Sequence, residues 1–249
     1  MPKKRTIQLM CVNGEAMTKN PFDFDANPNL PITDYDIAVR QSIPGYDALL
    51  SMVTALCQLE LTDTAHILVV GAGGGNEIGA LGQAHPTWQF TGVDPSEKML
   101  AVAQSKVESL NLGERVTLHN GFVQELPLHQ FSAATSLLVM HFLPDDGSKL
   151  DYLQAIASRL QSGSPFLLVD FQGDRQSELF KRLVNGWQQR ARTAGMEPQR
   201  LTELVNDMLP HLHCIPEERT LELLAQAKFK NVTRFYTAFI FTGWLAFAG

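Results

Sequence analysis

The sequence predicts a single α/β domain with a mostly parallel sheet and helices on both faces, and three observations lead to this prediction. Short apolar runs alternate with helical patterns from about residue 66 to 170, which is typical of βαβ units with crossover helices. The apolar runs are nearly continuous, as in strands that are buried on both faces. The chain has 249 residues, of which 45% are hydrophobic, and this is enough for one large core. We therefore treat residues 1–249 as one domain.

The first predicted elements are helical. Residues 1–32 are rich in turn-forming residues and predict no regular element. A helix is expected to begin near Thr33, which is placed to cap it, and Pro44 interrupts it. A second helix is expected over about 45–59, because leucine and valine recur on one face. The helical N-terminal segment therefore covers about 33–60.

Alternating strands and helices make up the centre of the chain. Five apolar runs predict strands at 67–70, 89–93, 116–119, 133–140 and 165–170. Three helical patterns between them cover 76–84, 96–110 and 150–160. Ser96 is a suitable cap for the second of these helices. Successive strands joined by such helices lie parallel to one another.

The alternation ends at Gly173. Residues 174–213 predict an all-helical, arginine-rich insert that is longer than a simple crossover. It forms either a lid over the site or a pair of helices packed on the edge of the sheet. A helix is expected at 216–227, and two strands follow at 232–238 and 239–247. The two strands form either a hairpin or one bulged strand.

Composition and charge argue against several classes of protein. The formal net charge of −6 shows no overall basic footprint for nucleic acid. No apolar run reaches the roughly 18 residues that span a bilayer, and no signal-peptide core is present. The cysteines Cys11, Cys57 and Cys214 form no CxxC pair, and His211 and His213 do not complete a metal-ligand pattern. We therefore expect a cytoplasmic protein without a metal, a membrane anchor or a nucleic-acid partner.

A glycine-rich loop follows the first predicted strand. Residues 71–75 read Gly-Ala-Gly-Gly-Gly, and a predicted helix begins at Asn76. Glycine allows the backbone to approach a ligand closely, and the start of the helix offers unpaired N–H groups. Open α/β sheets bind ligands at this edge. The loop by itself is compatible with NAD, FAD, S-adenosylmethionine or phosphate.

An acidic residue narrows the choice of ligand. Asp94 ends the next predicted strand, at the roughly 20-residue spacing at which a carboxylate binds ribose hydroxyls. The alternative is an aspartate that only caps the next helix. The loop and the acid together favour a cofactor that contains adenosine. A dinucleotide fingerprint needs glycine or alanine where this chain has Asn76.

The same segments resemble a known family. Residues 71–77 and 91–100 resemble the first two motifs of class I S-adenosylmethionine-dependent methyltransferases, and 118–123 and 137–144 resemble two later ones. The resemblance implies a Rossmann-like class I methyltransferase fold, with a mostly parallel seven-stranded sheet, an antiparallel C-terminal strand and a helical cap. It also implies S-adenosyl-L-methionine as the cofactor. The cofactor contacts that it implies are Gly71, Ala72, Gly73, Asp94, Pro95 and Met99.

One position departs from the family. Many members carry an acid two residues before the first loop glycine, where this chain has Val69. Glu77 is a candidate substitute for that acid. The alternative is that Glu77 is a first-turn acid favoured by the helix dipole.

Residues 40–46 resemble a signature of the carboxy-S-adenosylmethionine synthase group within this family. In that group the tyrosine that matches Tyr46 contacts the cofactor; the alternative is an aromatic side chain that only fills the core. Ser136 stands where the group typically has asparagine. The further cofactor contacts that this resemblance implies are Phe122, Val123 and Ser136.

Two arginines are candidates for binding substrate. The synthase needs a cation to hold an extra carboxylate, and arginine suits this bidentate task. Arg200 falls near the corresponding place in the insert, and Arg40 belongs to the upstream signature. The alternative for Arg200 is a solvated surface charge.

His141 is the candidate catalytic base, because it follows the fourth strand near the expected position of the methyl group. The first hypothesis is a methyltransferase that acts on a small-molecule acceptor. The second is a carboxy-S-adenosylmethionine synthase, whose product serves tRNA wobble uridine modification. The third is an S-adenosylmethionine-binding protein without chemistry. A homodimer is compatible with all three.

Overall fold

The computed structural model describes residues 23–27, 32 and 34–249. The predicted cap Thr33 and most of the turn-rich segment 1–32 lie outside these residues. Within the described part, Asp23 closes a turn by accepting hydrogen bonds from the backbone N–H groups of Asp25 and Ala26.

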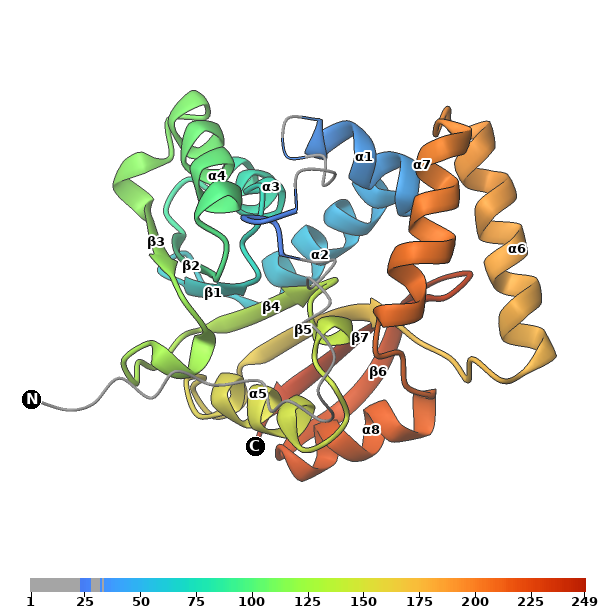
Figure 1. The fold of residues 1–249 in the computed structure, drawn as a ribbon. Coiled ribbons are helices and arrows are strands. Elements are labelled where there is room, and N and C mark those ends of the chain that lie inside the picture. The colour runs from blue at the N-terminus through green and yellow to red at the C-terminus, as the bar shows by residue number, and fades with distance from the viewer. Residues whose placement is uncertain (1–22, 28–31, 33) are drawn as a thin grey trace, which may run out of the picture.

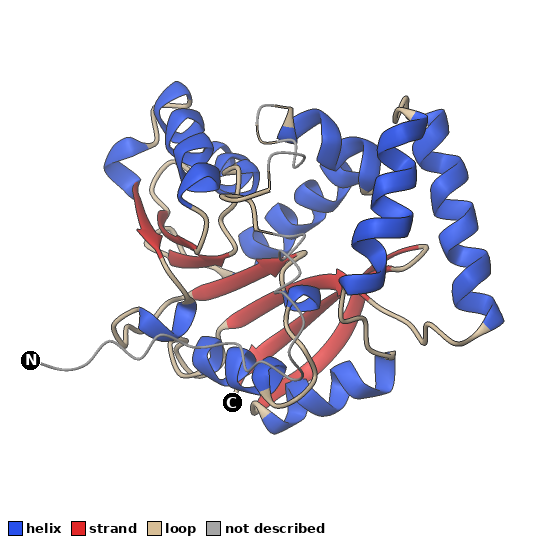
Figure 2. Ribbon diagram, in the orientation of Figure 1, coloured by secondary structure: helices blue, strands red, loops and turns tan. Residues whose placement is uncertain are grey.

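A seven-stranded sheet forms the centre of the molecule (Figures 1 and 2). Its spatial order is β3-β2-β1-β4-β5-β7-β6; the first five strands are parallel and β7 is antiparallel to both of its neighbours. The strands are β1 (His66–Val70), β2 (Gln89–Asp94), β3 (Val116–Asn120), β4 (Ala133–Leu137), β5 (Pro165–Phe171), β6 (Phe229–Ala238) and β7 (Phe241–Ala248). The predicted fold class is confirmed, including the antiparallel C-terminal strand. The strand order reverses between β1 and β4, where such sheets open a crevice.

Eight α-helices formed by the described residues surround the sheet. They are α1 (Tyr35–Ser42), α2 (Tyr46–Glu60), α3 (Asn76–Ala84), α4 (Glu97–Ser109), α5 (Ser148–Ala157), α6 (Glu178–Thr193), α7 (Pro198–Glu203) and α8 (Glu217–Gln226). None of them is long and apolar enough to cross a membrane.

The alternation of side chains along β1 explains why helices cover both faces. Ile67 and Val69 belong to a core that α2, α3, α4 and α6 complete. Leu68 and Val70 point the other way, into a core with α5 and α8. Successive residues of a strand face opposite sides, so an unbroken apolar run needs a helical layer on each. Figure 1 shows α5 and α8 together on one side of the sheet.

The fourth strand is shorter than predicted. The apolar run predicts a strand to residue 140, but β4 ends at Leu137. Leu138 has a left-handed backbone (φ +64°), and its N–H donates to Val169 O at 2.7 Å. The 3-10 helix η3 (Met140–Phe142) follows. The run stays apolar past the strand because Met140 is buried in the core, so hydrophobicity alone did not mark where the backbone turns.

The last two strands form a hairpin. The chain turns at Phe239 and Ile240, and Phe239 has a φ of +55°. The register between β6 and β7 shifts between Lys230 and Thr233 and again between Arg234 and Tyr236. Both predicted alternatives are therefore partly correct, since the element is a hairpin whose first strand is irregular.

The insert is all-helical, as predicted, and it packs beside α1 (Figure 1). Trp187 Nε1 donates to Ser42 O at 2.6 Å. Arg190 Nη1 donates to Gln41 O at 2.6 Å, and Gln41 Nε2 donates to Gly195 O at 3.1 Å. The last carbonyls of a helix have no partner within the helix. The insert therefore supplies the C-terminal caps of α1, and it makes one helical layer with the N-terminal segment.

Candidate active site

The glycine loop leaves β1 in a conformation that its sequence requires. Gly71 has a φ of +77°, a left-handed backbone that other residues adopt only with strain. Its N–H donates to Val93 O at 2.8 Å. A Cβ atom at this position would overlap Val139 Cγ2. The loop is therefore bonded to the end of β2, and Gly71, Ala72 and Gly74 line a pocket at this edge of the sheet.

Asp94 ties this loop to the end of β2. Its Oδ2 accepts from Gly73 N and its Oδ1 accepts from Ser96 N, both at 2.9 Å. Burial raises the pKa of Asp94, and the charge of Asp25 adds to this. The cap of α4 is Ser96, whose Oγ accepts from Met99 N at 3.1 Å. Asp94 is therefore not merely a helix cap, and each of its oxygens keeps a lone pair for a ligand hydroxyl.

A segment that the sequence did not single out lies beside Asp94. Asp25 Oδ1 accepts from Ser96 Oγ at 2.8 Å and from Lys98 N at 3.0 Å. Its Oδ2 accepts from Glu97 N at 3.1 Å. Three donors at the start of α4 thus hold the turn 23–27 next to the acid of β2. The signal was absent from the sequence pattern, because the partners are about 70 residues apart.

A small pocket opens between the glycine loop, α1, α2 and the end of β4; we call it the glycine-loop pocket. Its lining residues are Tyr35, Tyr46, Gly71, Ala72, Gly74, Asn76, Glu77, Leu137 and Leu138. Tyr46 is buried at its wall, a position compatible with the cofactor contact that the upstream signature implies and with an aromatic side chain that only fills the core. Tyr35, which the sequence did not indicate, packs on Gly74 so closely that a Cβ there would lie 2.7 Å from Tyr35 Cδ1. Burial, with the negative charges of Asp94 and Asp36, raises the pKa of Tyr35 to about 12.

The structure gathers most of the other predicted cofactor residues around this loop. Met99 is buried, with its Cε 3.7 Å from the Cβ position of Gly73. Val123 is buried beyond the end of β3, and Phe122 beside it is 53% exposed. Pro95 is exposed, and its carbonyl accepts from Asn120 Nδ2 at 3.0 Å.

Ser136 lies elsewhere. It is fully buried in β4, and its hydroxyl shares a hydrogen bond of 2.7 Å with the hydroxyl of Tyr152 on α5. Its side chain thus points to the core on the α5 side of the sheet. A cofactor contact by the Ser136 side chain stays a prediction that competes with this hydrogen bond.

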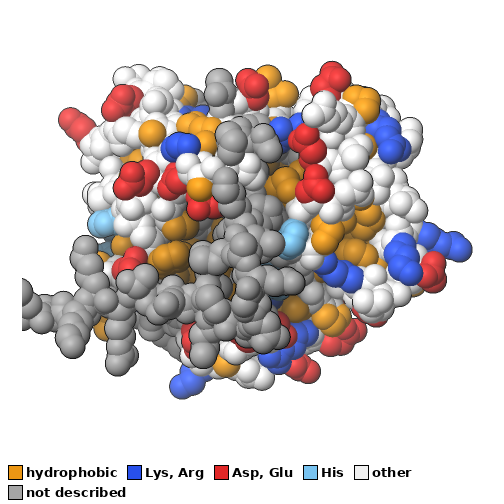
Figure 3. All heavy atoms as spheres, in the orientation of Figure 1, with side chains coloured by type: hydrophobic (Ala, Val, Ile, Leu, Met, Phe, Trp, Pro, Cys, Tyr) orange, Lys and Arg blue, Asp and Glu red, His pale blue; other side chains and the backbone are white. Residues whose placement is uncertain are grey.

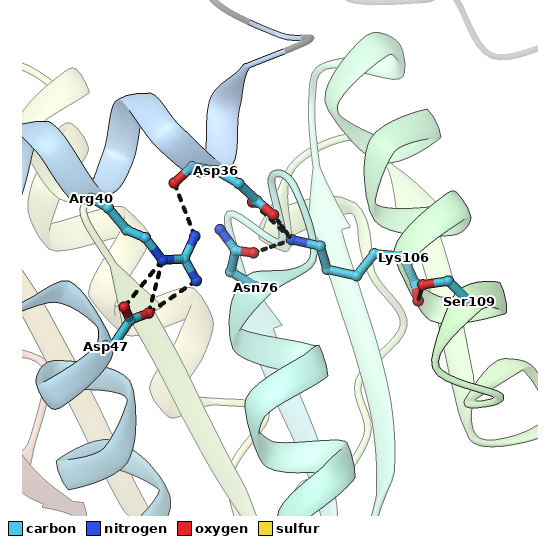
Figure 4. A network of polar contacts seen from close by, with 6 residues as sticks. All are labelled: Asp36, Arg40, Asp47, Asn76, Lys106 and Ser109. Atoms are coloured by element: carbon cyan, nitrogen blue, oxygen red, sulfur yellow. Dashed lines mark hydrogen bonds and ion pairs between the residues drawn. The ribbon is translucent and has the colours of Figure 1, made fainter. Parts of the chain in front are cut away.

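Arg40 is engaged by its own neighbours (Figure 4). Its Nε lies 3.0 Å from Asp47 Oδ1, and its Nη1 donates to Asp36 O at 2.9 Å. Lys106 pairs with the carboxylate of Asp36 at 2.8 Å and also contacts Asn76 Oδ1. Asp36, Arg40, Asp47 and Lys106 line an open groove between α1, α2, α3 and α4 and do not line the glycine-loop pocket, whereas Asn76 lines both.

Arg200 lies on α7 and lines neither this groove nor the glycine-loop pocket. Burial lowers its pKa, while the charges of Glu203 and Asp34 oppose this. Its buried Nε has no hydrogen-bond partner within the described ranges. The structure therefore does not bring Arg40 and Arg200 together.

His141 is paired with a carboxylate that the sequence did not reveal. Its Nδ1 bonds to Oδ1 of Asp170, which also accepts the His141 backbone N–H at 3.1 Å. Both side chains are buried. The imidazole packs edge-on against Phe171, with ring centroids 4.7 Å apart. Asp170 stands at the end of β5, so a strand-end acid was visible, but its partner lies 29 positions away.

Further contacts fix this pair in place. Lys149 is fully buried, and its Nζ donates to Met140 O at 2.6 Å. Burial lowers the pKa of Lys149, and the charge of Asp170 opposes this. The backbone N–H of His213, the last residue of the insert, donates to His141 O at 2.7 Å. The end of the insert is thus attached directly to the segment that carries the histidine.

The surface around these sites is mixed in character. In the view of Figure 3, hydrophobic side chains gather near the middle of the face, and charged side chains of both signs are interspersed over it. No three His, Cys, Asp or Glu side chains within residues 23–27, 32 and 34–249 gather to hold a metal ion.

Comparison with known proteins gives the same fold. A family model described as a methyltransferase domain matches residues 67–163, which run from β1 to just before β5. The carboxy-S-adenosyl-L-methionine synthase of Campylobacter concisus is 24% identical over 230 residues, covering 91% of this chain and 94% of that protein.

Two solved structures share the fold. A possible exported protein from Bordetella parapertussis has a TM-score of 0.64 at 18% identity, over 81% of this chain and 67% of that one. A SAM-dependent methyltransferase from Aquifex aeolicus has a TM-score of 0.58 at 16% identity, over 86% of this chain and 98% of that one. Together with the loop geometry and the position of Asp94, these findings support a class I S-adenosylmethionine-dependent methyltransferase: residues 67–163 match a methyltransferase domain, and the chain shares the fold.

Proposed function

We propose that this protein transfers the methyl group of S-adenosylmethionine to a small-molecule acceptor that must lose a proton, with His141 as the general base. The observation that carries the proposal is the buried His141–Asp170 pair. It lies at the ends of β4 and β5, a few residues beyond Leu137 and Leu138, which line the glycine-loop pocket.

The residues around the glycine loop fit the cofactor. Gly71 and Ala72 present backbone close to the pocket, and the carboxylate oxygens of Asp94 suit the two ribose hydroxyls. Met99 and Val123 supply apolar surface for the adenine. The bound cofactor supplies an electrophilic methyl group on a sulfonium, and the protein supplies orientation and a dry site.

The pair gives the imidazole a defined role. Asp170 accepts a hydrogen bond at Nδ1, which favours the tautomer with its free lone pair on Nε2. The carboxylate also stabilises the imidazolium that forms when Nε2 takes a proton. An acceptor hydroxyl is the simplest group that needs this help, because it is a poor nucleophile until its proton leaves.

The helical layer of α1, α6 and α7 is the proposed cover for the acceptor. It stands at the carboxyl edge of the sheet (Figure 1), and the backbone of His213 connects its far end to His141. Acceptor-binding surfaces on this fold come from such variable inserts. The acceptor site therefore combines the insert with the ends of β4 and β5.

The proposal is tested with His141→Ala and Asp170→Asn, assayed by formation of S-adenosylhomocysteine against a panel of small hydroxylated acceptors. We expect His141→Ala to lower kcat about 10²- to 10⁴-fold, with the Kd for S-adenosylmethionine unchanged. His129→Ala, at an exposed position, is the matched control. Full activity of His141→Ala towards an accepted hydroxyl substrate would overturn the role of this residue.

A second candidate function is synthesis of carboxy-S-adenosylmethionine. It is supported by the relatives of that name, which match most of the chain, and by the buried Arg200 Nε that lacks a partner among the described residues. Mass spectrometry of the ligand released from purified protein separates the two candidates. A carboxylated species that disappears in Arg200→Met supports the synthase; S-adenosylmethionine or S-adenosylhomocysteine alone supports the methyltransferase.

A further inference from the structure

Three buried polar atoms near the glycine-loop pocket have no hydrogen-bond partner within the part of the chain that the structure describes. They are Asn76 Nδ2, Glu77 Oε1 and Thr135 Oγ1. Asn76 and Glu77 line the pocket directly, together with Tyr46 and Gly71. Thr135 lies on β4 opposite Val69 of β1. Unpaired buried polar groups are rare and cost about 1–3 kcal/mol each, so a cluster of them at one pocket indicates a missing ligand.

Glu77 is the most unusual member of this cluster. It is the second residue of α3, yet only 6% of it is exposed. A first-turn acid that serves only the helix dipole would remain at the surface, so this alternative does not account for its position. Burial raises the pKa of Glu77 to about 8, and the nearby Thr135 hydroxyl opposes this.

No cation of the described residues contacts Glu77. The titratable groups that face it are tyrosines of α1, α2 and α5 and a cysteine of α2, and none of them is positively charged. These groups are Tyr35, Tyr46, Tyr152 and Cys57. Among the described residues the acid therefore has no positively charged partner, and a ligand cation is suited to supply one.

Asn76 offers the opposite kind of group. Its Oδ1 is held by Lys106, as Figure 4 shows. An amide whose oxygen faces a lysine has its NH₂ group turned the other way, and this group lies near the carboxylate of Asp36 and the hydroxyl of Tyr46 but makes a well-formed hydrogen bond to neither. A donor with spare hydrogen-bonding capacity thus stands next to an acid without a cation among the described residues, on adjacent positions of α3.

We propose that these two residues bind the zwitterionic amino-acid end of the cofactor, the Glu77 carboxylate holding the α-ammonium and Asn76 Nδ2 donating to the α-carboxylate. The inference rests on the proposed function, because it requires S-adenosylmethionine in this pocket. A carboxylate–ammonium pair and an amide–carboxylate hydrogen bond satisfy all the unpaired groups of the two residues.

The test uses isothermal titration calorimetry with three ligands. S-adenosylmethionine carries both charged groups, decarboxylated S-adenosylmethionine carries only the ammonium, and 5′-methylthioadenosine carries neither. Glu77→Gln should weaken the first two about 10- to 100-fold, the range of a lost charged hydrogen bond, and leave the third unchanged. Asn76→Ala should weaken only the first, by about 5- to 10-fold.

Matched controls separate this proposal from the proposed function. Glu97→Gln changes an exposed first-turn acid on α4 and should change no affinity. Asp94→Ala should weaken all three ligands alike, because all contain the ribose. Equal losses for all three ligands in Glu77→Gln, or no loss, overturn the inference while the proposed function stands. Wild-type protein that binds none of the three overturns both.

Proton release gives a second readout. Because burial keeps Glu77 protonated near neutral pH in the free protein, pairing with an ammonium group should expel that proton. Titrations of S-adenosylmethionine at pH 7 in buffers of different ionisation enthalpy should therefore show about one more proton released by the wild type than by Glu77→Gln. Equal proton release would contradict the pairing.

Discussion

Two regions of the molecule differ in how far apart in the sequence their hydrogen-bonded residues lie. In the cofactor half, from β1 to α4, Gly73 meets Asp94 across 21 positions, and Ser96 caps its own helix at Met99. In the acceptor half, which comprises η3, β5 and the insert, Trp187 reaches Ser42 across 145 positions. The cofactor half therefore follows local sequence patterns, whereas the acceptor half depends on which distant segments meet.

The difference extends to buried charge. The cofactor half presents Asp94 with backbone donors supplied by its own loop and helix. The acceptor half buries Asp170 against His141 and leaves Asp170 Oδ2 without a partner among the described residues. A short segment supplies backbone N–H donors whenever it folds locally. A side-chain partner from another strand is present only when the two strands pack together.

The sharpest test of the local character of the cofactor half is Gly71→Ala. We expect a loss of about 3 kcal/mol in unfolding free energy, from left-handed backbone strain and from overlap with Val139. Urea denaturation measures it. Gly113→Ala, where nothing lies within 4 Å of the added Cβ, is the control and should change stability by less than about 1 kcal/mol. Equal stability of the two variants would show that the loop relaxes freely.

A pH profile of stability tests whether the cofactor half also contains a buried carboxyl group, Glu77, that lacks a positively charged partner among the described residues. Burial raises the pKa of Glu77 from its ordinary 4.5 to about 8, so the free folded protein binds more protons than the unfolded chain between these values. Unfolding free energy should fall as pH rises from about 4.5 to 8, by a few kcal/mol. Glu77→Gln should flatten this part of the profile, measured by urea denaturation in the absence of cofactor. An unchanged slope would mean that Glu77 is ionised throughout.

The long-range character of the acceptor half is tested with Arg190→Met. This variant keeps the apolar stem but removes the hydrogen bonds to the carbonyls of Arg40 and Gln41. We expect α6 to lose about 1–2 kcal/mol of local stability, seen as amide exchange about 5- to 30-fold faster in α6 with β1 unaffected. Arg192→Met, at an exposed position in the same turn, should leave exchange unchanged. If both variants behave alike, the insert does not depend on this cap.

The smallest effect is expected at the Arg40–Asp47 ion pair, which is partly exposed. A double-mutant cycle with Arg40→Met and Asp47→Asn should give a coupling energy of about 0.2–1 kcal/mol. Because Arg40 is engaged by Asp47, we expect neither variant to change the KM for the acceptor. A higher KM confined to Arg40→Met would instead support the predicted role of Arg40 in binding substrate.

Much of the candidate site was predictable because its signals are local. The strand–loop–helix order identified Gly71 and Asp94, and Ser96 was correctly predicted as a cap. The upstream signature singled out Tyr46, which lies at the pocket wall, and its contact with the cofactor stays a prediction. Backbone conformation and capping depend on a few neighbouring residues, so the pattern carries them.

Other features could not be predicted, because they depend on packing between distant segments. The end of β4 was misplaced, since Leu138 turns the chain while the apolar run continues. Asp25, Tyr35 and Asp170 were missed because nothing near them in the sequence indicates their partners. The sequence showed that Glu77 is an acid in the first turn of a helix, but it did not show that this side chain is buried.

The sequence by itself determined the α/β class, the order of strands and helices, and the position of the glycine loop beside the acid that ends β2. These follow from hydrophobic periodicity and from residues with special backbone preferences, which act over one or two turns of chain. Only the tertiary structure decided that Glu77 is buried without a cation, that Asp170 holds His141, and that the insert caps α1. Burial and long-range pairing arise when segments far apart in the chain pack together, and the hydrophobic pattern of one segment does not specify its partner.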